Sequence, residues 1–331
     1  MPLSRLKIAI AAGDPAGIGP EIALKTALDP KVRAACDPII VCDAGLIEQH
    51  AQACGIKVEL RVVKRAADAD WSEAQVNVLD CPLPYASGIA IGANAADSGR
   101  ASIAFCAAAI KAARTGAVDA VIGAPQNETS IALAGIPFDG HPSFVARETG
   151  TDVDDVYLML CFGETRIAHV TLHRSVREAL AMITRERVGR AIGATHQALR
   201  KLHIAEPKIC VSGLNPHAGE DGLFGREEID MIRPAMEAAA REGISLAGPV
   251  GADIMFQRKG YDAFLVMLHD QGHVAAKVMS PNATAAMTIG VPILFASVAH
   301  GSAHDIAGKG IASPAAMIEA VRQLTGRKIQ I

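Results

Sequence analysis

Three histidines follow strand-like apolar runs and could together bind a metal ion. His217 lies in the glycine-rich stretch 213–228, which presents its side chain from a loop. His173 ends the sequence His-Val-Thr-Leu-His, and His269 follows the apolar run 263–268. Three imidazoles bound to Zn²⁺ or a similar ion leave one coordination position for a substrate oxygen, which is the pattern of a catalytic site. Taken singly, each histidine is better explained as a hydrogen-bonded core or loop residue, because spacing alone does not show that the three meet.

Short β-rich runs alternate with longer alanine-rich segments of helical period, and this pattern predicts the scaffold that positions the histidines. The alternating segments are 7–11 and 20–27, 38–42 and 46–54, and 101–115 and 118–123. A further helix is expected over 185–203, followed by a strand at 208–211. The alternation predicts an α/β fold with parallel strands.

The composition favours a folded globular chain of one large or two ordinary domains. Half of the 331 residues are hydrophobic, which is ample for a core. The net charge of −3 is spread without a basic block, and one Trp, three Tyr and eight Phe offer no base-stacking platform, so nucleic acid is not an expected partner. Seven cysteines without CxxC spacing are interpreted as reduced thiols. No apolar run approaches the roughly 18 residues of a membrane span, and the expected location is the cytoplasm.

Two glycine-rich segments could approach a nucleotide. Asp14-Pro-Ala-Gly-Ile-Gly-Pro-Glu21 could bind an anion through its amides, although a tight turn without a ligand explains it equally well. The segment 300–314 resembles the adenosine-binding loop of the β-decarboxylating dehydrogenases. Asp305 and Ile306 stand where NAD-using members of that group carry the same pair, since a carboxylate binds ribose hydroxyls and repels a 2′-phosphate. The resemblance implies NAD as cofactor, with binding residues His300, Gly301, Ser302, Asp305, Ile306 and Gly308.

Nearly the whole chain resembles the 4-hydroxythreonine-4-phosphate dehydrogenase family. The matching motifs, in the family's order, are 13–21, 140–141, the His173 segment, 213–220 with 225–228, 252–253, and 269–272 with Lys277. The resemblance implies a two-domain isocitrate/isopropylmalate dehydrogenase-like α/β fold with an interdomain cleft. The first domain is expected at 1–135 plus 293–331, and the second, with the metal ligands and the contacts of a homodimer, at 136–292.

The same resemblance implies roles for individual residues. His173, His217 and His269 would bind the divalent metal, with zinc expected first and manganese, cobalt or magnesium as alternatives. His141 and Lys277 would contact substrate. Lys277 is also a candidate for moving a proton, and Asp253 and Asp270 for orienting the imidazoles or the lysine during catalysis. His273 and His304 are interpreted as polar loop or surface histidines.

Three departures from the family pattern bear on the substrate. The phosphate-ester enzymes carry Thr, Asn and Arg where this sequence has Pro142, Ala286 and Phe295. A phosphate depends on charge-assisted hydrogen bonds of about 1.5–3 kcal/mol each, so replacing Arg by Phe removes a cation and adds desolvation. A more apolar pocket that includes Pro142 and Phe295 is therefore expected to bind a ring rather than a phosphorylated chain.

The dehydrogenases of carboxylated cis-dihydrodiols are the branch of the family that fits such a pocket. This sequence is similar to that branch at 124–125, 127–129, 142–143, 169–173 and 267–273. The implied activity is NAD-dependent and metal-dependent oxidative decarboxylation in aromatic catabolism, converting terephthalate 1,2-cis-dihydrodiol to protocatechuate. Two alternatives remain: a phosphate-ester dehydrogenase, acting on 4-phosphohydroxy-L-threonine or a phosphorylated aldonate, and a catalytically silent protein that binds dinucleotide or metal.

Overall fold

The computed structural model describes residues 5–72, 75–281, 283–326 and 329 of the chain. The chain divides into two compact units, Met1–Gly150 with Pro292–Ile331, and Thr151–Val291. Residues 136–150, which the sequence analysis assigned to the second domain, group with the first unit. None of the described helices is long and apolar enough to cross a membrane.

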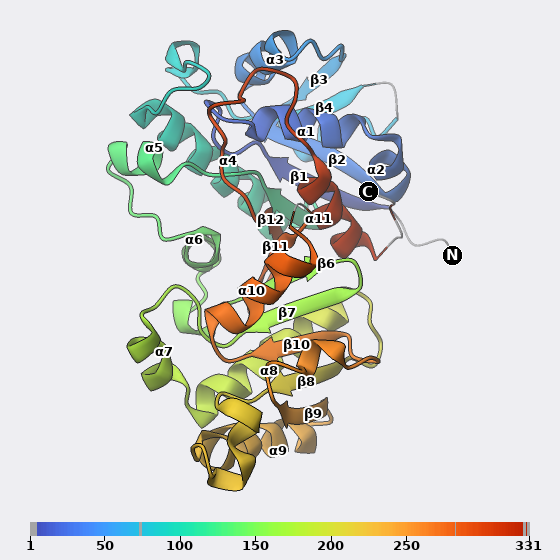
Figure 1. The fold of residues 1–331 in the computed structure, drawn as a ribbon. Coiled ribbons are helices and arrows are strands. Elements are labelled where there is room, and N and C mark those ends of the chain that lie inside the picture. The colour runs from blue at the N-terminus through green and yellow to red at the C-terminus, as the bar shows by residue number, and fades with distance from the viewer. Residues whose placement is uncertain (1–4, 73–74, 282, 327–328, 330–331) are drawn as a thin grey trace. The chain divides into compact units, whose positions relative to one another are not determined.

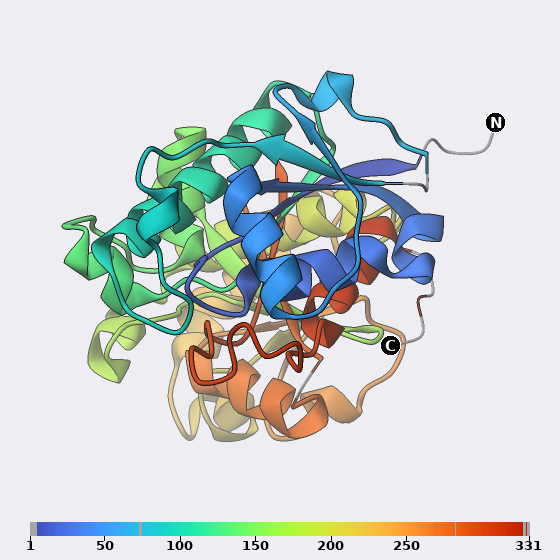
Figure 2. The ribbon, with the colours of Figure 1, turned by 90° about the horizontal axis from the view of Figure 1, so that it is seen from above.

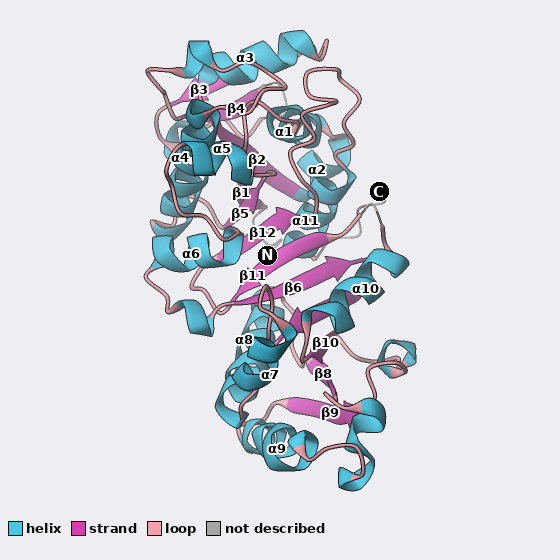
Figure 3. Cartoon of the chain, turned by 60° about the vertical axis from the view of Figure 1, so that its left-hand side comes forward, coloured by secondary structure: helices cyan, strands magenta, loops and turns pink. Residues whose placement is uncertain are grey.

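The first unit is built on a parallel sheet (Figure 1). Its strands run in the order β3-β4-β2-β1-β5-β12. In Figure 3 they lie between α4 on one side and α1, α2 and α11 on the other. Because helices cover both faces, the central strands are apolar, and residues 8–11 of β1 are completely buried. The strands are β1 (Leu6–Ala11), β2 (Cys36–Cys42), β3 (Leu60–Val63), β4 (Val76–Asp80), β5 (Ala120–Gly123) and β12 (Leu294–Val298).

Several helices of the first unit begin at recognisable signals. Asp29 accepts hydrogen bonds from the backbone N–H groups of Lys31 and Val32, and Asp43 accepts one from Leu46, so each aspartate caps a helix. The helices are α1 (Gly19–Leu28), α2 (Pro30–Ala35), α3 (Ala44–Ala53), α4 (Ala96–Arg114), α5 (Glu128–Leu133), α6 (His141–Thr149) and α11 (Ala315–Thr325). The predicted segments 20–27, 46–54 and 101–115 correspond to α1, α3 and α4.

The second unit has a mixed sheet in the order β11-β6-β7-β10-β8-β9. In Figure 3 α8 lies on one side of its strands and α10 on the other. The strands are β6 (Tyr157–Phe162), β7 (Thr165–His169), β8 (Lys208–Ser212), β9 (Ser245–Val250), β10 (Ala263–Val266) and β11 (Ala285–Ile289). The helices are α7 (Val176–Met182), α8 (Arg185–Lys201), α9 (Arg233–Arg241) and α10 (His269–Met279).

The α/β class is confirmed, but the expectation of parallel strands is wrong for part of the second unit. β6 pairs antiparallel with β7 and with β11. Only Gly163 and Glu164 separate β6 from β7, and a two-residue loop can join only antiparallel neighbours. Gly163 has φ +51°, the left-handed conformation that such a tight turn needs.

Candidate functional site

The three parallel strands β7, β10 and β8 carry the predicted metal ligands just beyond their carboxyl ends. In the ladder Val266 pairs with His169, and Leu265 pairs with Val211. The three strands therefore end at the same edge of the sheet, where α/β proteins commonly bind ligands. His173 follows β7, and His269 follows β10 as the first residue of α10.

Two of the predicted ligands lie together within a group of four histidines. The ring centroids of His173 and His269 are 5.6 Å apart. His273 stacks on His269 with centroids 3.7 Å apart and planes 10° apart, and His169 lies 4.7 Å from His273. A cavity of about 470 Å³ is lined by both His173 and His269, together with neighbours that include Arg174, Ser175 and Asp270.

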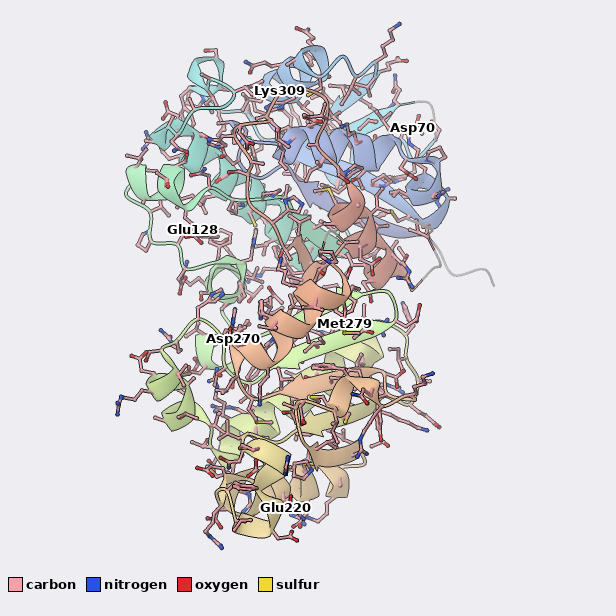
Figure 4. The ribbon with its side chains drawn as sticks, in the orientation of Figure 1. Asp70, Glu128, Glu220, Asp270, Met279 and Lys309 are labelled. Carbon is pink, nitrogen blue, oxygen red and sulfur yellow. The ribbon has the colours of Figure 1, made fainter. Side chains whose placement is uncertain are left out.

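His217 lies elsewhere in the second unit. The backbone from His217 to Asp221 is left-handed throughout, with φ between 43° and 83°. The His217 side chain is 66 % exposed, and its ring packs edge-on against Phe224. Figure 4 labels Glu220 in this loop and Asp270 at the start of α10. Within the described residues no three or more His, Cys, Asp or Glu side chains form a group that could hold a metal ion.

The chemistry of the imidazoles nevertheless fits a divalent metal. Nδ1 of His269 lies 2.7 Å from a carboxylate oxygen of Asp270, and Nδ1 of His217 lies 3.4 Å from one of Glu220. A neutral imidazole that donates its Nδ1–H to a carboxylate keeps a lone pair on Nε2, which is how protein carboxylates orient metal-binding histidines. Asp270 is thus placed for the orienting role that the sequence suggested.

The other two predicted catalytic residues are Asp253, near the His217 loop, and Lys277, on the same helix as His269. A Cβ added at Gly251 would come 2.7 Å from a carboxylate oxygen of Asp253 and 3.7 Å from the Cα of His217, so this turn packs against the His217 loop. Lys277 is exposed on α10. It follows His269 and His273 at intervals of four residues, and the three side chains share one helix face.

The predicted cofactor loop is fastened to α1 of the first unit (Figures 1 and 2). The N–H of Ile18 donates to the carbonyl of Ser302 at 2.9 Å, and the ammonium of Lys25 donates to the carbonyl of Gly310 at 2.9 Å. Asp305 is exposed on this loop.

His141 and Phe295, two predicted substrate contacts, pack against each other in the first unit. Phe295 is 0 % exposed, and its ring centroid lies 5.5 Å from that of His141. Phe138 meets His141 edge-on at 6.0 Å. Nε2 of His141 is buried and has no hydrogen-bond partner among the described residues, and burial lowers the pKa of this histidine to about 4. Pro142 occupies the first turn of α6.

Residues 34–324 match the family model described as pyridoxal phosphate biosynthetic protein PdxA. The chain belongs to the PdxA family. It is 37 % identical over 324 residues to the 1,2-dihydroxy-3,5-cyclohexadiene-1,4-dicarboxylate dehydrogenase of Comamonas sp., with 98 % of each chain covered. Its relatives are named dehydrogenases, and the chain is an oxidoreductase of this family.

Two similar solved structures of the PdxA family carry the names of enzymes that act on different substrates. A terephthalate 1,2-cis-dihydrodiol dehydrogenase from Burkholderia xenovorans LB400 is 42 % identical, with a TM-score of 0.74 and coverage of 97 % of this chain and 98 % of that one. A 4-hydroxythreonine-4-phosphate dehydrogenase from Burkholderia phymatum is 35 % identical, with a TM-score of 0.87 and the same coverage. The dihydrodiol enzyme is thus closer in sequence, and the phosphate-ester enzyme is closer in backbone.

The interpretation of His273 as a polar loop or surface histidine is wrong in this PdxA family member, whereas His304 does lie in a loop but is only 16 % exposed. His273 is half-buried on α10 and hydrogen-bonded to the completely buried His169. Nε2 of His304 lies 2.6 Å from a carboxylate oxygen of Asp14, which is also completely buried. Burial lowers the pKa of His169 to about 3 and that of His273 to about 4. Neither pair was predicted, because each joins residues far apart in the chain.

The buried ring of His141 should make the stability of the PdxA family protein fall in mild acid. The folded protein holds this ring neutral, whereas the unfolded chain takes up a proton below pH 6.5. The contribution is present above pH 6.5 and is lost toward pH 4, at up to about 1.4 kcal/mol per pH unit. Urea unfolding at several pH values should show a smaller slope in this window for His141→Phe than for the parent protein. Equal slopes would contradict the prediction.

Proposed function

We propose that this chain oxidises a carboxylated cis-dihydrodiol with NAD⁺ and releases CO₂, converting terephthalate 1,2-cis-dihydrodiol to protocatechuate. Hydride passes from the carbinol carbon to NAD⁺, and loss of CO₂ from the neighbouring carbon then restores the aromatic ring. The name of the Comamonas relative and the 42 % identity to the Burkholderia xenovorans enzyme support this substrate.

The apolar surroundings of His141 are the observation that carries the choice of substrate. This ring stays uncharged at neutral pH because burial lowers its pKa to about 4. Phe295 and Phe138 pack against it. A neutral imidazole among phenyl rings can offer one hydrogen bond to a hydroxyl or carboxylate, but it provides no cation for a phosphate dianion. These surroundings suit a carboxylated ring.

The proposed metal ligands are His173, His217 and His269, with zinc as the expected ion. When bound, the ion would supply Lewis-acid stabilisation of the negative charge that develops on the substrate oxygen. Asp270 accepts the Nδ1 proton of His269 at 2.7 Å and thereby keeps its Nε2 atom available, while Glu220 lies 3.4 Å from Nδ1 of His217. Lys277, on the same helix face as His269, is proposed to hold a substrate carboxylate or to give a proton to the enolate oxygen left when CO₂ departs, which becomes a hydroxyl of the aromatic product.

The proposed metal site is completed by a second copy of the chain. One copy brings His173 and His269 together, while its own His217 is exposed on a separate loop. Two helices of the second unit carry exposed apolar side chains: Val176 and Leu180 on α7, and Val274, Val278 and Met279 on α10. We propose that α7 and α10 form the homodimer contact, which brings the partner's His217 to this pair.

Asp305 and its neighbours on the 300–308 loop are proposed to bind NAD. The loop is fixed to α1, so the exposed carboxylate of Asp305 is held in place before the cofactor binds. Two ribose hydroxyls can donate to this carboxylate, whereas a 2′-phosphate would be repelled. The two-domain isocitrate/isopropylmalate dehydrogenase-like architecture belongs to the same proposal.

NADH formation by the zinc-loaded protein tests the substrate. We expect saturable turnover with terephthalate cis-dihydrodiol, and no turnover with 4-phosphohydroxy-L-threonine under the same conditions. Release of one CO₂ per NADH would identify the decarboxylation. Turnover of the phosphate ester alone would overturn the proposal in favour of the phosphate-ester function, which the TM-score of 0.87 to the Burkholderia phymatum enzyme supports.

A further inference from the structure

His169 and His273 form a chain of hydrogen bonds that starts in the core of the second unit. His169 ends β7 and is 0 % exposed. Its Nδ1 lies 3.3 Å from the carbonyl oxygen of Leu158, and its Nε2 lies 3.1 Å from Nδ1 of His273. The His273 ring in turn stacks on His269, with planes 10° apart. A backbone carbonyl is thus connected through two imidazoles to a proposed metal ligand.

The carbonyl of Leu158, at the buried end of this chain of hydrogen bonds, determines which ring nitrogen of His169 and of His273 carries the proton. A carbonyl oxygen can only accept, so His169 carries its proton on Nδ1 and has a lone pair on Nε2. That lone pair can only accept, so His273 must also carry its proton on Nδ1. Nδ1 of His273 also lies 3.3 Å from the carbonyl of His269, a second acceptor that agrees with this assignment. Both rings are therefore fixed as Nδ1–H tautomers.

Gly272 of α10 leaves the space that the His169 ring occupies beside this helix. A Cβ added at Gly272 would lie 2.2 Å from Nε2 of His169 and 2.9 Å from Cγ2 of Ile167. Glycine at this position of α10 is what allows the buried ring to reach His273. Glycine inside a helix costs about 1 kcal/mol relative to alanine, so its presence indicates a packing requirement.

We propose that His169 and His273 are positioning residues that hold the His269 ring in a single orientation for metal binding. The inference rests on the proposed function, because it takes His269 as a ligand. The stacked His273 ring restricts rotation of His269 about its Cβ–Cγ bond, and the hydrogen bond to His169 holds His273 itself in place. Asp270 fixes the Nδ1 proton of His269, and the stack fixes the plane of its ring.

Metal affinity and histidine tautomers together test this role. We expect His273→Leu and His169→Leu each to weaken Zn²⁺ binding by about 10–100-fold, the usual loss when a residue that orients a ligand is removed. Co²⁺ in place of Zn²⁺ should give a changed visible spectrum in both variants. His196→Leu makes the same substitution on α8 and should bind both ions as the parent protein does. Unchanged affinity in folded His273→Leu would overturn the proposal.

The tautomers of His169 and His273 can be determined by NMR in the metal-free protein, so this test does not depend on activity. Long-range ¹H–¹⁵N spectra should report Nδ1–H for His169 and His273, and His169→Leu should let His273 populate the Nε2–H form. A parent protein with His273 protonated on Nε2 would overturn the chain of hydrogen bonds. His269→Ala separates the two hypotheses: if it leaves Zn²⁺ affinity unchanged, the proposed metal site fails, whereas the tautomer spectra still decide the pairing of His169 with His273.

Discussion

His217→Ala is expected to abolish metal binding and NADH formation together. The loss should exceed the roughly 10–100-fold that follows removal of a residue that only orients a ligand. The His217 ring is 66 % exposed on a loop, so its removal should leave the fold unchanged. Zn²⁺ affinity, measured by competition with a chromogenic chelator, and turnover of the dihydrodiol should both fall, while the unfolding midpoint of the metal-free protein stays constant.

Two further measurements make the His217 prediction specific. His196→Ala, on α8 of the same unit, should keep both metal binding and turnover. If His217 acts in the partner's site, mixing His217→Ala with His269→Ala protomers should restore part of the activity, because one of the two sites in a mixed dimer then has a full set of ligands. A His217→Ala protein that still binds zinc and turns over substrate would refute the ligand assignment.

Asp14→Ala is expected to lower the free energy of unfolding by about 3–5 kcal/mol, the usual cost of removing one partner from a buried ionic or hydrogen-bonded pair. The Asp14 carboxylate is completely buried and accepts hydrogen bonds from the hydroxyl of Ser98, the N–H of Ala16 and Nε2 of His304. Its removal leaves the buried Ser98 hydroxyl and the His304 ring without their acceptor. Denaturant unfolding measures the effect directly.

A double-mutant cycle with His304→Ala should identify the coupling within this pair. The two single changes should not add, because each removes the same contact between the 13–21 turn and the cofactor loop. Asp68→Ala provides a matched control, since Asp68 is exposed and pairs with the exposed Arg65, and surface pairs contribute little. Additive losses in the cycle, or an Asp14→Ala protein as stable as the control, would contradict the prediction.

Much of the scaffold was predictable because it follows from local patterns. The segments 7–11, 38–42, 118–123 and 208–211 correspond to strands β1, β2, β5 and β8. Strands covered by helices on both faces appear in the sequence as short apolar runs between helical segments. Strand-like runs also ended just before the candidate histidines, but spacing alone did not show that any of them meet, as His173 and His269 do.

The contacts that support the site could not be predicted in this way. His169 and His273 are separated by 104 residues and meet only because β7 and α10 pack together. Gly272, in the middle of a helical segment, was the one local sign of a close approach. The antiparallel β6 strand was also missed, because an apolar run gives no information on the direction of its neighbours.

The left-handed loop from His217 to Asp221 has a consequence for how quickly a ligand can be captured. A left-handed conformation costs a residue other than glycine roughly 1–2 kcal/mol, and the segment that leads into the loop is held by Glu228, which is 1 % exposed and accepts hydrogen bonds from the N–H groups of Leu214 and Asn215. The loop therefore has its shape before anything binds, and little conformational entropy is lost on binding. Because of this preorganisation, His217 is held in one position before a ligand arrives. The rate at which the ligand associates should therefore depend on how often it encounters the loop, and not on folding of the loop.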